Sequence, residues 1–161
     1  MPDLTSLAAS VGALLKAKGQ SIAVAESACG GLISAALVAV PGASAYYLGG
    51  GVIYTTASRR GVLHLPDEAY AGMRASTEPY ALLNARTIRD HHNATWGVGE
   101  TGASGPTGNR YGDAAGHACL AVAGPVERTL TLETGVGDRE GNMWTFAKAA
   151  LDLLEACLKA Q

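Results

Sequence analysis

The sequence is poor in the features that mark several classes of protein. Of its 161 residues, 16% are charged and 6% are aromatic, and the formal net charge at pH 7 is -2. The sequence also has no cluster of basic residues that could release counterions from a nucleic-acid backbone. We therefore expect no nucleic-acid partner.

Long apolar runs are missing as well. No run approaches the roughly 20 residues of a membrane span, and the segment from Met1 to Thr5 lacks the cationic start of a signal peptide. These two absences predict a cytoplasmic protein that does not associate with a membrane.

Cysteine is scarce, and its three copies follow no ligand spacing. Cys29, Cys119 and Cys157 are odd in number and form no CxxC motif, which argues against a disulfide framework and against a zinc site. The carboxylates also show no paired spacing with the 4 histidines. We therefore expect reduced thiols and no metal ion.

The residues that are abundant are apolar or small. Hydrophobic residues make up 48% of the chain, the mean hydropathy is +0.13, and 21 residues are glycine. A chain of this length and apolar content can bury one substantial core, which excludes intrinsic disorder and predicts a single domain over residues 1–161. The glycines favour tight turns and ligand-binding loops built from backbone.

Helical and strand patterns alternate along most of the chain. Apolar residues at helical spacing predict helices that begin near residues 4, 29, 57, 77 and 138. Thr5 or Ser6 is available to cap the first helix, which should end at Gly19, and Asp138 should cap the last. Short β-compatible runs predict strands over residues 21–26, 46–55, 96–100, 115–123 and 126–134.

This order of elements predicts the fold class. Helices between the early strands imply right-handed parallel crossovers, whereas Gly124-Pro125 joins the last two strands in an antiparallel hairpin. We expect an α/β protein, a three-layer α/β/α sandwich with a mostly parallel sheet and one antiparallel strand. Ligands of open sheets bind at the carboxyl ends of the strands, where Glu26-Ser27, Thr55 and Thr101-Gly102 should converge.

The segment from Glu26 to Gly31 is the strongest candidate for chemistry. Ser27 stands at a strand-to-helix turn, as a nucleophile would, and free N–H groups at the next helix start could hold an oxyanion or a phosphate. The alternative is that Ser27 only caps that helix. Cys29 is a rival nucleophile because a helix N-terminus lowers the pKa of a thiol, and its alternative role is that of a small packing residue.

A second candidate is the segment from Gly102 to Asp113, which is too rich in glycine, proline and asparagine for regular structure. As a loop it could wrap an anion with its N–H groups and Arg110, or it could be a mobile surface loop. Gly97-x-Gly99-x-x-Gly102 matches a dinucleotide-binding string, but these glycines fall within a predicted strand, so we reject that function. For His117, in the strand after the loop, a structural role is favoured.

Four segments together resemble the CinA C-terminal family: ESACGG at 26–31, PGASAYYLGGGVIYT at 41–55, TGASGPTG at 101–108 and GDRE at 137–140. Their order and spacing match over nearly the whole chain. The family includes nicotinamide-nucleotide amidases, which convert nicotinamide mononucleotide to nicotinic acid mononucleotide and ammonia. The resemblance implies a three-layer α/β/α fold, a homodimer, a nucleotide-like substrate, and neither metal nor cofactor.

The resemblance also implies site residues. It makes Ser27 the nucleophile, and it pairs the family's serine with a lysine that follows a tyrosine-centred strand end. Here Tyr54 is kept, whereas Arg59 stands at the lysine position, and an arginine is not deprotonated in proteins. The proton would then pass to Tyr54 or to water, or Arg59 would assist electrostatically. The expected substrate-binding residues are Cys29, Gly30, Gly31, Thr101, Gly102, Gly105, Gly108, Arg110 and Arg139.

Two functions therefore remain open. In the first, the protein is an amidohydrolase in which Ser27 attacks a carboxamide and backbone N–H groups around Cys29 to Gly31 hold the oxyanion. The segment from Gly102 to Asp113, called the glycine-rich loop below, then encloses a nucleotide. In the second, it is a non-catalytic member of the family that binds a nucleotide or related anion. Arg59 then donates two parallel hydrogen bonds to a phosphate or carboxylate.

Overall fold

A computed structural model describes residues 3–161, and Met1 and Pro2, part of the segment considered above for a signal peptide, lie outside the described residues. The helices are α1 (Thr5–Lys18), α2 (Leu32–Val38), α3 (Thr56–Leu63), α4 (Glu78–His92) and α5 (Arg139–Lys159). The strands are β1 (Ile22–Glu26), β2 (Tyr47–Val52), β3 (Trp96–Ala103), β4 (His117–Ala123) and β5 (Arg128–Glu133). Two short 3-10 helices, Ala43–Ala45 and Asp67–Tyr70, complete the regular structure of this part of the chain.

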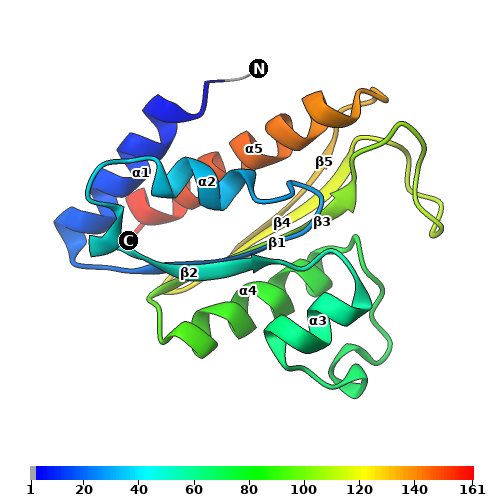
Figure 1. The fold of residues 1–161 in the computed structure, drawn as a ribbon, viewed down its shortest axis with the longest axis horizontal. Helices are drawn as coiled ribbons and strands as arrows, with labels where there is room; N and C mark the ends of the chain where they lie inside the picture. The colour runs from blue at the N-terminus through cyan, green and yellow to red at the C-terminus, as the bar shows by residue number, and fades with distance from the viewer. Residues whose placement is uncertain (1–2) are drawn as a thin grey trace.

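The five strands form one sheet in the order β2-β1-β3-β4-β5. β1 pairs in parallel with β2 and β3, whereas β4 pairs antiparallel with both β3 and β5. β1, β2, β3 and β5 therefore run in one direction and β4 in the other. Helices α1, α2 and α5 cover one face of the sheet, and α3 and α4 cover the other (Figure 1). The predicted three-layer sandwich with one antiparallel strand is confirmed.

Close packing between α4 and β3 explains two of the glycines in the rejected dinucleotide string. A Cβ on Gly97 would lie 2.0 Å from the carbonyl oxygen of Ala85, and one on Gly99 would lie 2.0 Å from that of Ala81. The absence of side chains therefore lets the backbone of the helix approach the backbone of the strand. Gly97 and Gly99 therefore allow α4 to pack closely against β3.

Several element boundaries differ from the prediction because tertiary contacts override local pattern. β3 extends to Ala103, since Gly102 and Ala103 pair with Ala118 and His117 of β4. The first helix has Leu4 at its N-cap and no side-chain cap, so the expectation of Thr5 or Ser6 as a capping residue was wrong. The stop at Gly19 is confirmed by its left-handed φ of 62°. Asp138 occupies the N-cap position of α5 but makes no capping hydrogen bond with its side chain.

None of the helices within residues 3–161 has the length and apolar character needed to cross a membrane.

Candidate functional site

The ends of β1, β2 and β3 meet at one cavity, as the sequence predicted for their carboxyl edge. The cavity has a volume of about 620 Å³ and reaches from Ser27 to the first turns of α3 and α4. Ser27 is half-buried. The segments that line the cavity contribute Ser27, Ile53, Tyr54, Thr55, Thr56, Arg59, Met73, Arg74, Ala75, Ser76, Tyr80, Thr101, Gly102, Asn109, Arg110 and Tyr111.

A smaller hollow of about 240 Å³ continues this cavity toward the glycine-rich loop. It shares Tyr54, Gly102 and Asn109 with the larger one. Its remaining lining includes three of the expected binding residues, Gly105, Gly108 and Arg139. Thr101, Gly102 and Arg110 line the larger cavity, so the structure brings these six residues to one region with Ser27.

The N–H groups after Ser27 have acceptors within the protein. Those of Ser27 and Cys29 donate to Oε2 of Glu100, at 2.8 and 2.9 Å, and that of Gly30 donates to the carbonyl oxygen of Ser27 at 3.0 Å. The proposed oxyanion role of Cys29 to Gly31 therefore requires that these bonds be exchanged for bonds to a ligand.

The start of α2 is capped by a carboxylate. The N–H groups of Ile33 and Ser34 donate to the carboxylate of Glu26, at 2.9 and 3.1 Å. Gly31 is the N-cap residue, in the left-handed conformation, and no side-chain cap bond is made. The expectation that Ser27 caps this helix was therefore wrong, and so was the expectation of free N–H groups at the helix start.

Cys29 is a packing residue. Its side chain is fully buried in the core. Burial, together with the charges of Glu100 and Glu26, raises the pKa of the Cys29 thiol well above its ordinary value. A thiol that stays protonated is a poor nucleophile, so the rival assignment of Cys29 as the nucleophile was wrong.

A capping box fixes the segment that carries Tyr54 and Arg59. The N–H of Ser58 donates to Oγ1 of Thr55 at 3.2 Å, and the N–H of Thr55 donates to Oγ of Ser58 at 2.8 Å. These reciprocal bonds satisfy two N–H groups at the start of α3. Tyr54 and Arg59, which both line the cavity, are thus carried by a well-defined helix start.

Arg59 is a fixed cation. Its guanidinium lies 3.9 Å from the centroid of the Tyr70 ring and donates to Asp67 at 3.3 Å. Burial lowers the pKa of Arg59, but hydrogen bonding with Tyr80 and Asp67 raises it more, so the net shift is upward. Arg59 can hold an anion or orient a neighbour, but it cannot accept the proton of Ser27.

Arg139 connects Tyr54 to the glycine-rich loop. Its guanidinium donates to the hydroxyl oxygen of Tyr54 at 2.9 Å and to the carbonyl oxygen of Gly105 at 2.6 Å. Arg139 was expected to bind substrate. The structure shows its side chain lining the smaller hollow while it positions Tyr54.

The glycine-rich loop is held by side-chain hydrogen bonds. Arg74 donates twice to the carboxylate of Asp113, at 2.7 and 3.1 Å, and the amide of Asn109 donates to the same carboxylate at 2.8 Å. The guanidinium groups of Arg74 and Arg110 lie 5.2 and 5.0 Å from the centroid of the Tyr111 ring. These two cations and the aromatic ring line the cavity.

Ser76 adds a hydroxyl to the lining, and His117 helps to hold it. Ser76 has a φ of 59°, and its N–H donates to Oγ1 of Thr101 at 3.1 Å. Its carbonyl oxygen lies 2.8 Å from Nε2 of His117, whose Nδ1 contacts Glu133. Burial lowers the pKa of His117, but Glu133, the Ser76 carbonyl and Asp113 raise it more, so the net shift is upward. Both ring nitrogens face acceptors, which is the structural role that we favoured.

Sequence reasoning missed part of this lining. Arg74, Ser76 and Tyr80 were outside the expected segments, whereas Asn109 and Tyr111 lie in the predicted Gly102–Asp113 loop but were not named individually. Arg74 and Ser76 reach the site through contacts with residues 39 and 25 positions away, so no local pattern reveals them. The only available signal was the Thr77-Glu78-Pro79 helix start, which places Tyr80 in a first turn.

Metal-ligating side chains do not cluster in the part of the chain that the structure describes. Across residues 3–161, no three His, Cys, Asp or Glu side chains form a group that could hold a metal ion. The three cysteines are free and buried.

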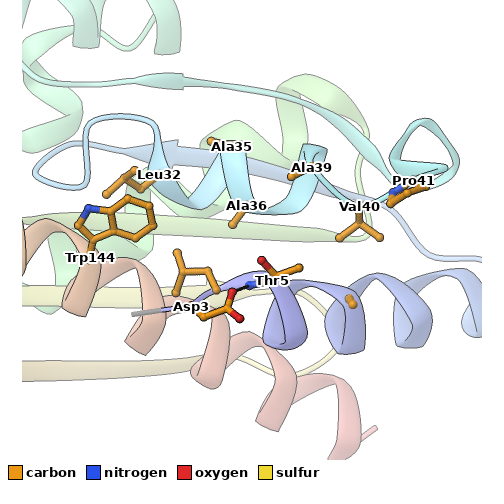
Figure 2. A pocket seen from close by; sticks show the side chains of 11 residues that line it. Asp3, Thr5, Leu32, Ala35, Ala36, Ala39, Val40, Pro41 and Trp144 are labelled. Carbon is orange, nitrogen blue, oxygen red and sulfur yellow. Dashed lines mark hydrogen bonds between the residues drawn. The ribbon is translucent and has the colours of Figure 1, made fainter. Parts of the chain in front are cut away.

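A second concavity lies in the other helical layer. It is an apolar groove of about 380 Å³ between α1 and α2, with Trp144 of α5 and Leu32 at one end and Val40 and Pro41 at the other (Figure 2). Asp3 is the only titratable side chain in its described lining. The groove therefore offers mostly apolar surface, with the Asp3 carboxylate as its one titratable group in the described lining.

Comparisons with known proteins agree on one family. The chain matches the sequence model of the CinA C-terminal domain over residues 4–158. It is 40% identical over 153 residues to a CinA-like protein of Anaeromyxobacter sp. (strain Fw109-5), which covers 95% of this chain and 37% of that protein. The chain thus spans little more than a third of the length of the curated relatives it matches.

Solved structures give the same result. The fold is similar to that of a CinA superfamily protein from Klebsiella pneumoniae 700603, with a TM-score of 0.91 and 26% identity over 99% of this chain and 100% of that one. It is also similar to competence damage-inducible protein A from Klebsiella pneumoniae subsp. pneumoniae MGH 78578, with a TM-score of 0.90 and 28% identity over 98% of each chain.

Proposed function

The chain belongs to the CinA C-terminal domain family, and we propose that it is an amidohydrolase that acts on nicotinamide mononucleotide with Ser27 as nucleophile. One observation carries the proposal. Ser27 borders a cavity whose described lining contains three arginines, three tyrosines and no carboxylate. Such a lining suits a ligand that combines a phosphate with a flat ring.

The reaction has two steps. The Oγ atom of Ser27 attacks the carboxamide carbon, the carbon–nitrogen bond breaks, and ammonia leaves with the hydroxyl proton of the serine. Water then attacks the ester, which releases nicotinic acid mononucleotide and restores the serine hydroxyl.

Tyr54 is the proposed proton carrier. The described lining of the cavity holds no lysine, histidine or carboxylate, and Arg59 stays charged. The hydroxyl of Tyr54 accepts a hydrogen bond from Arg139, whose positive charge can stabilise a negative charge that develops on that oxygen. Arg59, which lines the same cavity, then acts electrostatically.

A non-catalytic role is the second candidate, and the identity of residue 59 favours it. Without a base at this position, the same cavity serves to bind a nucleotide or related anion. Arg59 and Arg110 then act as donors to phosphate or carboxylate.

Ammonia release from nicotinamide mononucleotide by the purified protein tests the proposal. We expect slow release at neutral pH. Ser27→Ala should lower turnover to the uncatalysed background, because loss of a serine nucleophile costs on the order of 10⁶-fold in a well-studied serine hydrolase. Folding and nucleotide binding should persist, because Ser27 caps no helix.

Two outcomes oppose the proposal. Binding without any ammonia release would favour the non-catalytic role, and unchanged turnover in Ser27→Ala would remove Ser27 from the mechanism.

A further inference from the structure

Glu100 is a buried carboxylate with only half of its hydrogen-bonding capacity used. It lies on β3, the middle strand of the sheet, and its residue is 1% exposed. Its Oε2 accepts the N–H groups of Ser27 and Cys29, whereas its Oε1 has no partner among the described residues. A buried carboxylate normally pairs with a cation or receives several donors, so this arrangement needs an explanation.

Glu26 provides the comparison within the same turn. It is also fully buried, but each of its oxygens accepts an N–H, from Ile33 on Oε2 and from Ser34 on Oε1. Glu26 is therefore satisfied as an anion by the start of α2. Glu100 differs from it in having a free oxygen.

Among residues 3–161, no positive charge faces Glu100. From β1 it faces Glu26, and from the turn after β1 it faces the thiol of Cys29. The core on this side of the sheet is completed by apolar side chains of β4 and α5, such as Leu120, Phe146 and Ala147. Burial raises the pKa of Glu100 to about 7; the N–H groups of Cys29 and Ser27 oppose this shift, and Glu26 adds to it.

We propose that Glu100 is a positioning residue for Ser27, and that gain or loss of a proton on its free oxygen regulates how firmly the Ser27 turn is held. In the acid form the proton sits on Oε1, and Oε2 remains a neutral acceptor for both N–H groups. In the ionised form the same two bonds are charge-assisted, and such bonds are roughly twice as strong as neutral ones. Any effect of Glu100 on ammonia release rests on the proposed function. The effect of its protonation on the hydrogen bonds that hold the Ser27 turn does not.

Amide hydrogen exchange of Ser27 and Cys29, followed by NMR between pH 5.5 and 8.5, tests this proposal without any substrate. After correction for the intrinsic pH dependence of exchange, protection of both amides in the wild-type protein should rise by about threefold to tenfold, with a midpoint near pH 7. Glu100→Gln, which keeps an acceptor but cannot ionise, should show no such rise.

Glu26→Gln is the matched control. The rise should persist in this variant, with its midpoint at lower pH, because the charge of Glu26 raises the pKa of Glu100. A flat protection profile in the wild-type protein, or an undiminished rise in Glu100→Gln, would overturn the proposal.

A second measurement covers the case in which Glu100→Gln does not fold. The carboxyl ¹³C signal of Glu100 in the wild-type protein should titrate with the midpoint of the amide protection. A midpoint below pH 5 would overturn the proposal.

The pH dependence of ammonia release then separates the two claims. If the protein releases ammonia, the wild-type rate profile should contain a group with the midpoint of the protection rise, and Glu100→Gln should lack it. If no ammonia is released while the protection rise is present in the wild type and absent in Glu100→Gln, the proposed function fails and the control of the turn stands.

Discussion

At the residue scale, Arg59 is the position at which family resemblance and chemistry disagree. The resemblance expects a lysine that could lose its proton, whereas the side chain present stacks on Tyr70 and pairs with Asp67. It lines the cavity that Ser27 borders. Its charge can orient a substrate or stabilise an anion, but the proton of Ser27 needs another acceptor.

Arg59→Lys should therefore raise the rate of ammonia release at neutral pH. A positioned base contributes about 10²- to 10⁴-fold, and a lysine among other cations can lose its proton. The measurement is kcat/KM for nicotinamide mononucleotide. Arg60→Lys is the control, because Arg60 also contacts Asp67 but is exposed and does not line the cavity. If the wild-type protein is already fast and Arg59→Lys slows it, a different base operates and Arg59 acts as a clamp.

At the element scale, the sequence predicted the order and type of the helices and strands but not all of their ends. Repeating apolar spacing and stop residues such as Gly19 act locally, so they could be recognised without a structure. The start of α2 could not be, because Glu100 accepts the N–H groups of Ser27 and Cys29 in the preceding turn, and Glu26 accepts that of Ile33 in the first turn of the helix. Glu100 makes these bonds from 73 and 71 residues away.

The packing of α4 on β3 gives a stability prediction at this scale. Gly99→Ala should lower the free energy of unfolding by about 1–3 kcal/mol or more, because its Cβ would lie 2.0 Å from the carbonyl oxygen of Ala81. Gly61→Ala is the control. It lies within α3 with nothing near its Cβ position, so the substitution should raise the free energy of unfolding by about 0.5–1 kcal/mol. Urea unfolding measures both. Equal effects would contradict the close approach of α4 and β3.

At the scale of the whole molecule, the sheet edge brings together segments that are distant in the sequence. The convergence of Ser27, Thr55 and Thr101 was predictable, because the carboxyl ends of parallel strands share one edge. The contribution of the segment before α4 was not, because Arg74 and Ser76 reach the site through partners on the glycine-rich loop and β3. The catalytic and binding roles of these residues, and the homodimer, stay predictions.

If Ser27 is the nucleophile, it forms a covalent bond with its substrate. Intact-protein mass spectrometry after rapid acid quenching with nicotinamide mononucleotide tests it most directly. We expect an adduct with the mass of the nucleotide less ammonia, located on the peptide that contains Ser27 and absent from Ser27→Ala. An adduct on another residue, or an adduct of the same mass in Ser27→Ala, would contradict it.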